Sequence, residues 1–344
     1  MPLATIGDPI PHITLPNTEG VGVNLGHQSR AGHWQVLAFV EPNEAPQIKD
    51  VVIAARDRLK AIGANIYLIA LCAPDASMEG VDLFDESRQC PGFLVGKPTS
   101  GIAVLAPSGC LSAQVHNLDE AIAHCEAGAA KTTSDLITAT APVLLIDNLF
   151  DDDLCDRLMA FWNESPKQQG SVATSSYGNE AMARQIKRRQ DVVIPDGPLF
   201  EEIKKILGRK VLPQVTRAYQ MQIASMAMLV IGEYNESDAG AFAAHRDNTT
   251  PYTAHRRFAM SANLNTGDFE GGEVRFPEFG PNLYKPSRGG CVIFSCGLLH
   301  EAMPVTKGSR IGLFSFMTDA AGLEQEKAMQ EKLRAESHEK VPAS

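Results

Sequence analysis

His245 and Asp247 are the residues whose type and spacing most directly suggest chemistry. In an extended strand, residues i and i+2 point to the same face, about 6–7 Å apart. These two side chains can therefore converge on one ion. His300 follows the apolar run 291–295, which predicts a strand that ends in a turn. Two histidines and one carboxylate on one side of a metal leave its other positions open, a donor set suited to iron(II) that reacts with dioxygen.

Arg310 stands ten residues after His300 and opens the apolar run 311–316. A His-x-Asp triplet occurs often by chance, so its company matters. A cation at the start of a buried strand is costly without an anion. Arginine matches a carboxylate with two parallel hydrogen bonds. This residue predicts a dicarboxylic cosubstrate, and an ordinary surface arginine is the alternative.

Short strands separated by Gly, Pro and Asn surround these residues. They are predicted at 225–234, 241–247, 256–264, 272–276, 289–295 and 309–317. This pattern is typical of a jelly roll or barrel. Strands at 143–148 and 189–194 precede them, together with a helix that Asp151 caps and one from Pro198 to Leu207 that Gly208 ends. A charged, exposed helix is expected at 323–339.

The first third of the chain follows a different pattern. A buried strand at 36–40, a helix at 48–62 and a strand at 66–71 predict a parallel crossover unit, with Gly63 ending the helix. A third strand at 102–106 and a helix at 119–126 complete it. With 344 residues, the chain is expected to form two domains. We place them at 1–128 and 142–320, with a linker at 129–141 and a tail at 321–344.

Composition limits the partners and the location. The net charge of −10 argues against nucleic acid or an anionic membrane as the main partner. No run approaches the roughly 18 apolar residues of a membrane span, and the N-terminus lacks signal-peptide features. The cytoplasm is therefore expected. Seven cysteines without a Cys-x-x-Cys pair indicate reduced, mostly buried thiols.

Six motifs in the second half resemble the prolyl 4-hydroxylase-like branch of the iron(II)/2-oxoglutarate dioxygenases. They agree in order and spacing over roughly residues 142–318. The matching pieces are Tyr234, then Gly240-x-Phe242-x-x-His245-x-Asp247-Asn248, then Phe269-x-Gly271-Gly272-Glu273, then Gly289-x-x-x-x-Phe294, then His300-Glu301-x-x-x-Val305, and then Gly308-x-Arg310. The family fold is a double-stranded β-helix, which agrees with the predicted jelly roll.

The resemblance implies roles for the matching positions. His245, Asp247 and His300 would bind Fe(II), and Arg310 would bind the distal carboxylate of 2-oxoglutarate. Tyr234 would hydrogen-bond the same carboxylate, and a core aromatic is the equal alternative. The reaction would consume O2, release succinate and CO2, hydroxylate an unactivated C–H bond and use ascorbate as reductant. Asp247 favours hydroxylation over halogenation.

The substrate is the open point. Peptidyl proline leads by resemblance, so a protein or peptide is expected, and a free amino acid or another small molecule is the alternative. Arg256, Arg257 and Arg275 are candidates for the substrate entrance or for ordinary surface charge. His255 lies in a polar loop and is expected to be exposed.

Residues 5–126 resemble the peroxiredoxin branch of the thioredoxin-like fold. The resemblance rests on Gly7-Asp8-Pro9-Ile10-Pro11, Leu25, Gly32, the strand 36–40 and Ala106-Pro107-Ser108-Gly109. A peroxidatic cysteine would follow that strand, where a helix N-terminus lowers its pKa. The chain has Glu41 to Gln47 there, without a cysteine. We therefore predict no peroxidase activity, and substrate binding, homodimerisation and stabilisation of the second domain stay open as roles.

Two other functions are alternatives to the hydroxylase. A thiol-dependent redox protein would rely on Cys72, Cys90 or Cys110, but the missing cysteine after residue 40 argues against it. A non-catalytic binding protein built from two degenerate domains conflicts with the intact His245, Asp247, His300 and Arg310 set, because decay would not spare all four.

Overall fold

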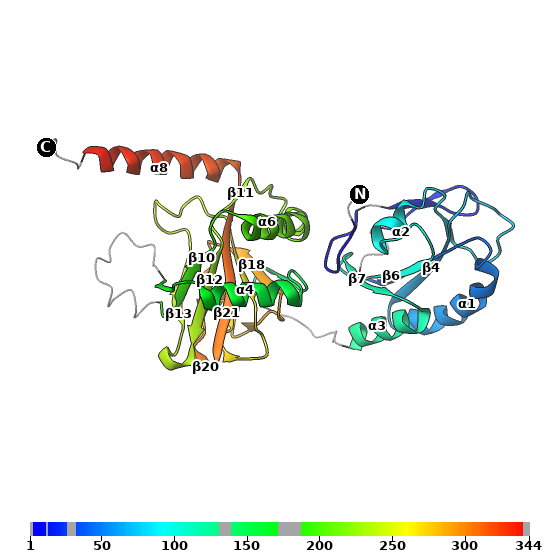
Figure 1. Ribbon diagram of the computed structural model, residues 1–344, viewed down its shortest axis with the longest axis horizontal. Coiled ribbons are helices and arrows are strands. Elements are labelled where there is room, and N and C mark those ends of the chain that lie inside the picture. The colour runs from blue at the N-terminus through cyan, green and yellow to red at the C-terminus, as the bar shows by residue number, and fades with distance from the viewer. Residues whose placement is uncertain (1–2, 12, 26–31, 131–138, 171–186, 340–344) are drawn as a thin grey trace. The chain divides into compact units, whose positions relative to one another are not determined.

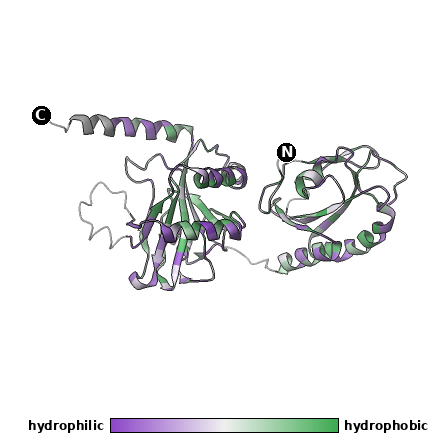
Figure 2. Ribbon diagram, viewed as in Figure 1, coloured by the Kyte–Doolittle hydropathy of each residue, from purple (hydrophilic) through white to green (hydrophobic). Residues whose placement is uncertain are grey.

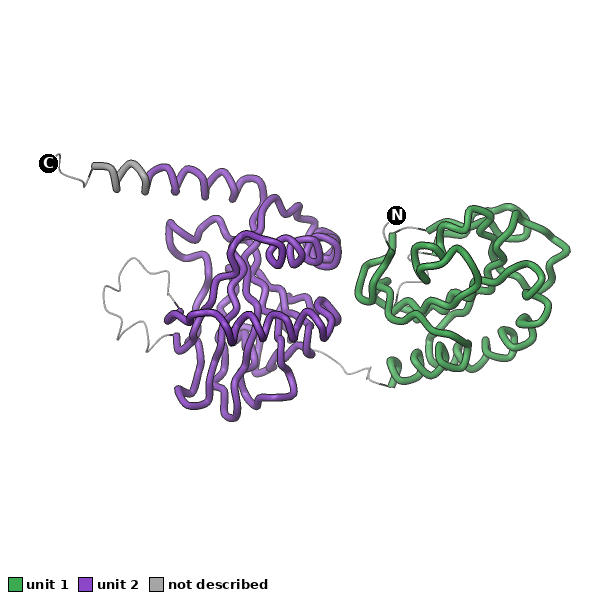
Figure 3. The backbone as a smooth tube through the Cα atoms, in the orientation of Figure 1, with its two compact units in different colours: residues 1–136 green, residues 137–344 purple. Residues whose placement is uncertain are grey.

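The computed structural model describes residues 3–11, 13–25, 32–130, 139–170 and 187–339, with side chains described as far as 332. The chain divides into two compact units, residues 1–136 and 137–344 (Figures 1 and 3). This division falls inside the stretch 129–141 that the sequence assigns to a linker, of which residues 131–138 lie outside the described residues. No helix in the described part of the chain is long and apolar enough to cross a membrane.

A five-stranded sheet forms the centre of the N-terminal unit, in the order β5-β4-β3-β6-β7. Its strands are β3 (Trp34–Val40), β4 (Ala64–Ala70), β5 (Leu83–Phe84), β6 (Gly101–Leu105) and β7 (Leu111–Val115). β3 and β4 are parallel and are connected by α1 (Ala45–Ala61), whereas β6 runs antiparallel to both of its neighbours. The predicted parallel crossover unit is therefore present.

Apolar side chains cover both faces of this sheet. On one face, α1 and α3 (Leu118–Ala130) contribute Leu59 and Ile122 to the core. On the other face, α2 (Gln89–Leu94) packs together with β1 (Thr14–Pro16) and β2 (Gly22–Asn24). The unit thus buries its sheet from both sides, as a strand–helix–strand order requires.

Glu41 stands directly after β3, where the peroxiredoxin resemblance would require a cysteine. Its carboxylate accepts two hydrogen bonds from Arg88, each 2.7 Å long. All seven cysteines of the chain are free, and five are buried. Burial raises the pKa of the half-buried Cys90 to about 12, and burial and nearby carboxylates also raise the pKa of Cys72. Since the thiolate is the nucleophile, these shifts argue against thiol chemistry in this unit.

The C-terminal unit is built on two facing sheets. The large sheet has the order β8-β18-β14-β21-β12-β10-β9, with β11 beside β21, and the small one has the order β13-β19-β16-β17. The strands of the large sheet are β8 (Val143–Ile146), β9 (Gln168–Gln169), β10 (Gln190–Val193), β11 (Ser225–Met226), β12 (Val230–Asn235), β14 (Phe258–Asn263), β18 (Cys291–Ser295) and β21 (Ser309–Thr318). Those of the small sheet are β13 (Phe242–His245), β16 (Val274–Arg275), β17 (Leu283–Tyr284) and β19 (His300–Ala302), and β15 (Glu270–Gly271) pairs with β20 (Val305–Lys307).

Successive strands of this unit alternate between the sheets. The chain passes from β12 in the large sheet to β13 in the small one, back to β14, across to β16, and so on to β21. This winding is the double-stranded β-helix that the sequence predicted. Phe276 and Phe294 pack between the two sheets. The outer face of the large sheet is buried by α4 (Asp152–Glu164), α6 (Pro198–Lys210) and α7 (Leu212–Tyr219).

Gly208 does not end its helix, which corrects the sequence prediction. α6 continues to Lys210, and α7 begins at Leu212. A single glycine inside a helix costs about 1 kcal/mol, whereas Leu207 and Val211 on either side of it are buried in the main core. Their burial outweighs that cost, because each fully buried aliphatic side chain contributes roughly 1.5–3 kcal/mol.

His255 is also not exposed as predicted. Its side chain keeps only 11% of its exposure, and Nε2 lies 3.9 Å from Oε1 of Glu326 in α8 (Ala320–Glu339). Burial lowers the pKa of His255, and the charge of Glu326 opposes this effect. α8 consists mainly of hydrophilic residues (Figure 2), as expected for this helix, but one side of it packs beside the loop that precedes β14.

Candidate metal centre

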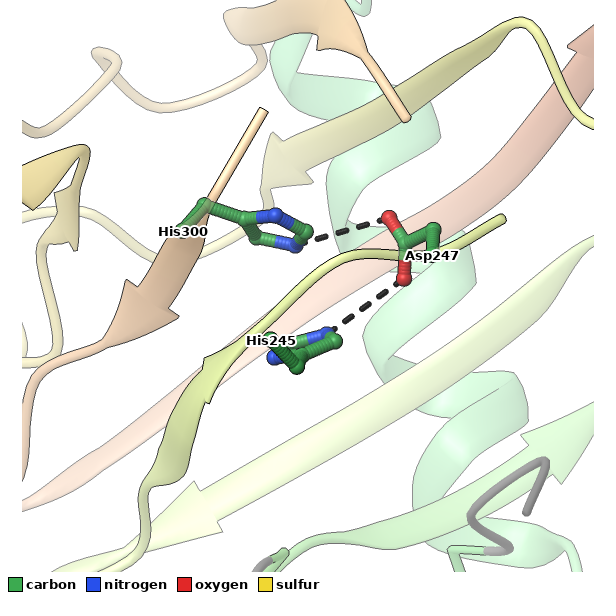
Figure 4. A group of neighbouring side chains, drawn as sticks. All are labelled: His245, Asp247 and His300. Carbon is green, nitrogen blue, oxygen red and sulfur yellow. Dashed lines mark ion pairs between the residues drawn. The ribbon is translucent and has the colours of Figure 1, made fainter. Parts of the chain in front are cut away.

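His245, Asp247 and His300 meet at one edge of the small sheet (Figure 4). β13 ends at His245, β19 begins at His300, and these two residues are antiparallel partners. Nε2 of His245 lies 3.3 Å from Oδ1 of Asp247, and Nε2 of His300 lies 3.4 Å from Oδ2 of the same carboxylate. The ligand atoms of all three lie within 4.8 Å of one another. The structure thus brings together the three residues that the sequence singled out.

Each imidazole is oriented by a carbonyl of its own strand or turn. Nδ1 of His245 lies 2.8 Å from the carbonyl oxygen of Ala243, and Nδ1 of His300 lies 3.0 Å from that of Leu298. A carbonyl only accepts, so Nδ1 carries the proton and donates it. In the neutral ring, Nε2 then presents a lone pair. Two lone pairs and one carboxylate therefore face one another, an arrangement that a divalent cation stabilises.

The protonation states of this cluster suit metal binding. Burial raises the pKa of Asp247, but the hydrogen bond from His245 and the charges of His300 and His245, which act when these rings are protonated, outweigh burial, so that the pKa lies below its ordinary value. Burial lowers the pKa of His300, against the pull of Asp247. Asp247 is thus ionised and His300 neutral near pH 7. These are the forms that coordinate metals.

Arg310 is only 1% exposed and lies near the start of β21. Its guanidinium donates to Oδ1 of Asn263 at 2.9 Å, to the carbonyl of Gly272 at 2.8 Å and to Oγ of Ser261 at 2.7 Å. None of the described carboxylates forms an ion pair with it. Arginine has five N–H groups, so one on each terminal nitrogen makes no hydrogen bond to the described part of the chain. A buried guanidinium with two free donors calls for an anion such as a carboxylate.

Gly272 makes room for this arginine. Its φ is +69°, and a Cβ atom built there would lie 3.0 Å from Cδ of Arg310. Both the backbone conformation and the space favour glycine. Tyr234 faces Arg310 across the β12–β21 pairing and is 3% exposed, with the guanidinium carbon 5.6 Å from its ring centre. Both of its predicted roles fit this place, because it is a core aromatic beside the buried cation.

One cavity of about 640 Å³ connects these groups. Its wall includes the three clustered residues, Arg310, Tyr234 and Ser261. It also includes Lys187, Arg189 and Asp191 around β10, which the sequence did not single out. Burial and the charge of Arg189 lower the pKa of Lys187 to about 8. A chamber of this size can accommodate a cosubstrate together with part of a second molecule.

The three arginines proposed for the substrate entrance separate in the structure. Arg256 lines the cavity. Arg257 pairs with Asp319 at 3.2 Å, and Arg275 pairs with Glu301 at 2.7 Å. Neither of these two is part of the cavity wall formed by the described residues.

Known proteins are similar to about half of the chain. No protein-family model matches it. The chain is 26% identical over 180 residues to a PKHD-type hydroxylase of Parvibaculum lavamentivorans, which covers 49% of this chain and 73% of the relative.

Solved structures with similarity to the chain include three prolyl hydroxylases. The viral collagen prolyl hydroxylase of Paramecium Bursaria Chlorella virus-1 in its 2OG complex is 17% identical, with a TM-score of 0.39 over 52% of this chain and 96% of that one. A prolyl hydroxylase from Trichoplax adhaerens, in complex with a peptide of hypoxia inducible factor, is 15% identical, with a TM-score of 0.44 over 55% and 87%. The Pseudomonas putida prolyl-4-hydroxylase is 15% identical, with a TM-score of 0.40 over 52% and 94%. The His–Asp–His geometry and the PKHD-type relative together confirm the predicted class of protein, a hydroxylase.

Proposed function

We propose that the C-terminal unit is an Fe(II)- and 2-oxoglutarate-dependent dioxygenase that hydroxylates an unactivated C–H bond. The observation that carries this proposal is the shared cavity of the His245–Asp247–His300 cluster and Arg310. A metal-binding cluster alone would fit many reactions. A buried guanidinium with two free donors in the same chamber adds a place for a carboxylate, and so for a metal-chelating dicarboxylic cosubstrate.

Each residue has a defined task in this proposal. His245, Asp247 and His300 would hold Fe(II) from one side and leave the opposite positions open. The bound metal and cosubstrate supply the chemistry that activates dioxygen and releases succinate and CO2. Arg310 would bind the far carboxylate of 2-oxoglutarate through one N–H on each terminal nitrogen, and Tyr234 would support the same group. Ser261 and Asn263 would hold the guanidinium in position.

Peptidyl proline is the first substrate to test, and ascorbate is the proposed reductant. The hydroxylase relative supports the reaction class, and the choice of a protein or peptide substrate rests on the motif resemblance alone. A free amino acid or another small molecule is the second candidate. We place the reaction in the cytoplasm.

For the N-terminal unit we propose a thioredoxin-like domain without a peroxidatic cysteine. Its sheet order and its parallel β3–β4 pair support this assignment. The Glu41–Arg88 ion pair where that cysteine would stand argues against a thiol-dependent function for the protein. Substrate binding, homodimerisation and stabilisation of the C-terminal unit are the roles to test.

A succinate-release assay tests the proposed function. The purified protein would be supplied with Fe(II), ascorbate and 2-oxoglutarate, and then challenged with proline-containing peptides and a panel of metabolites. We expect metal-dependent succinate formation that disappears in His245→Ala, Asp247→Ala and His300→Ala. His116→Ala is the matched control, because His116 is exposed and lies in the other unit. Failure of the wild-type protein to bind either Fe(II) or 2-oxoglutarate would refute the proposal.

A further inference from the structure

We propose that Arg256 is a second carboxylate-binding residue of the cavity. The primary substrate would then carry a carboxylate close to the carbon that is hydroxylated. This inference rests on the proposed function and specifies the substrate class of the same site.

Arg256 lies on the wall of the cavity, near the metal cluster but away from the cosubstrate arginine. Its guanidinium carbon is 3.8 Å from the ring centre of Phe316, which is six residues beyond Arg310 on β21. Six residues of strand span about 20 Å. Backbone hydrogen bonds connect this region to the His245–Asp247–His300 cluster. The amide of Asp247 donates to the carbonyl of Cys296 at 3.0 Å, and the amide of Cys296 donates to the carbonyl of Arg257 at 2.9 Å.

The Arg256 guanidinium forms no hydrogen bond or ion pair with the described residues. Its Nε is buried and makes no hydrogen bond, and no described carboxylate lies within 4.0 Å. Asp247 and Glu326 act on its pKa only from a longer distance, and burial, the larger effect, lowers that pKa. Once a divalent cation is bound, Asp247 is occupied by the metal. Arg256 is then a partly buried cation that still needs an anion.

The other cations of the cavity wall are already accounted for. Within the described residues they are Lys187, Arg189, Arg246 and Arg310. The first two share Asp191, at 3.2 Å from Lys187 and 2.5 Å from Arg189. Arg246 contacts Glu278 at 2.6 Å and the carbonyl of Gly297. Arg310 is assigned to the cosubstrate. Among the described residues, Arg256 is therefore the cation of this wall that the cluster, the cosubstrate and the carboxylates leave unused.

Stacking on Phe316 prepares this side chain for planar recognition. The aromatic ring fixes the plane of the guanidinium and leaves its edge free for two parallel hydrogen bonds. A carboxylate fits this edge, and a neutral amide or a hydrocarbon does not replace its charge. A substrate bound in this way would have its carboxylate beside the His245–Asp247–His300 cluster. Only carbons a few bonds from that carboxylate could then reach the reaction centre.

Two sources can provide such a group: the α-carboxylate of a free amino acid, or an acidic side chain next to the target residue in a peptide. Matched probes separate them. The first pair is L-proline and L-prolinamide, and the second is acetyl-Ala-Pro-Glu-amide and acetyl-Ala-Pro-Gln-amide. Calorimetric titration of the protein loaded with Zn(II), which does not support turnover, measures binding with Asp247 occupied, so the result is independent of the succinate assay that tests the proposed function.

We expect the acid of one pair to bind at least about tenfold more tightly than its amide, a difference of about 1.4 kcal/mol. Arg256→Gln should abolish this preference, and Arg256→Lys should retain part of it, since the charge stays but the fork is lost. Arg257→Gln is the matched control. It removes the same charge one residue away, from a side chain that pairs with Asp319 outside the cavity, and should leave the preference intact.

The pair that shows the preference identifies the source of the carboxylate. Melting temperatures of all variants establish that they are folded, and if Arg256→Gln is not, Arg256→Lys carries the test. The inference is overturned if neither acid binds, if acid and amide bind equally well, or if Arg257→Gln removes the preference as well. None of these outcomes affects the proposed reaction, which stands or falls with succinate formation by the wild-type protein.

Discussion

Replacement of Arg310 by glutamine tests the link between the buried guanidinium and the cosubstrate. In the proposed complex, two charge-assisted hydrogen bonds join the free N–H groups of Arg310 to the distal carboxylate of 2-oxoglutarate. Each such bond contributes roughly 1.5–3 kcal/mol, so their combined loss is roughly 3–6 kcal/mol. At about 1.4 kcal/mol per factor of ten, this is about a hundredfold to ten-thousandfold. We expect the lower end, because water replaces part of the interaction.

The substitution has a second effect, on stability without cosubstrate. Arg310 is buried with no described carboxylate as partner, so the folded protein bears the desolvation of a charge. The neutral glutamine removes this penalty and loses some of the three internal hydrogen bonds. We therefore expect Arg310→Gln to leave the melting temperature of the free protein within a few degrees of the wild type, while it abolishes the stabilisation that saturating 2-oxoglutarate provides.

Two measurements check this prediction: the KM for 2-oxoglutarate in the succinate assay, and the thermal shift on addition of 2-oxoglutarate. Arg310→Lys should be intermediate, because it keeps the charge and loses the paired donors. Arg257→Gln, outside the cavity, should behave as wild type. An unchanged KM and an unchanged thermal shift in Arg310→Gln would show that the cosubstrate carboxylate binds elsewhere.

Three further predictions concern other parts of the chain. Gly272→Ala should weaken 2-oxoglutarate binding and destabilise the protein by about 1–3 kcal/mol, because Gly272 has a φ of +69° and a Cβ atom there would lie 3.0 Å from Cδ of Arg310. Denaturant unfolding measures the loss of stability. Wild-type stability and binding in this variant would contradict the close approach of Gly272 to Arg310. The metal-free protein should lose stability as the pH falls below the ordinary histidine pKa of 6.5, and again below the ordinary aspartate pKa of 3.8. The folded-state pKa values of His300 and Asp247 lie below these ordinary values, so the unfolded chain binds more protons in these ranges. Melting temperatures of the wild type and Asp247→Asn across this pH range test the prediction, and a flat wild-type profile would be inconsistent with it. Cys72→Ser and Cys90→Ser should leave succinate formation and peroxide consumption unchanged, because both thiols have raised pKa values. A loss of either activity in these variants would support the thiol-dependent alternative.

The sequence predicts the metal cluster well because its geometry is mostly local. His245 is the last residue of β13 and Asp247 lies in the turn two residues on, where the predicted strand 241–247 has already ended. His300 follows the apolar strand β18 after a short turn. Arg310 could be identified because a cation at the start of an apolar strand is unusual. The double-stranded β-helix was predictable in class from the many short strands, although the boundaries of short strands such as β16 were drawn too wide.

Residues that act through tertiary contacts were missed. Ser261 and Asn263 hold Arg310, and the alternation of polar residues on β14 was the only local signal for them. The cluster around Asp191 depends on the pairing of β10 with β12, which lies far along the chain. The continuation of α6 past Gly208 likewise depends on the burial of Leu207 and Val211 against other elements. Local propensity cannot express such contacts.

The hydrogen bonds from His245 and His300 to backbone carbonyls bear on which metal ion the protein binds. Each ring is held by the carbonyl of the residue two positions before it, and His245 and His300 are antiparallel partners. Because the protein's own backbone orients both rings, we expect the chain to fold before it binds metal, unlike small zinc domains that need their ion to fold. A preformed N2O set binds zinc and copper more tightly than iron(II). Occupancy by iron(II) is therefore expected to depend on the metals supplied to the protein. Protein prepared in zinc-rich medium should be folded and should contain zinc in place of iron(II).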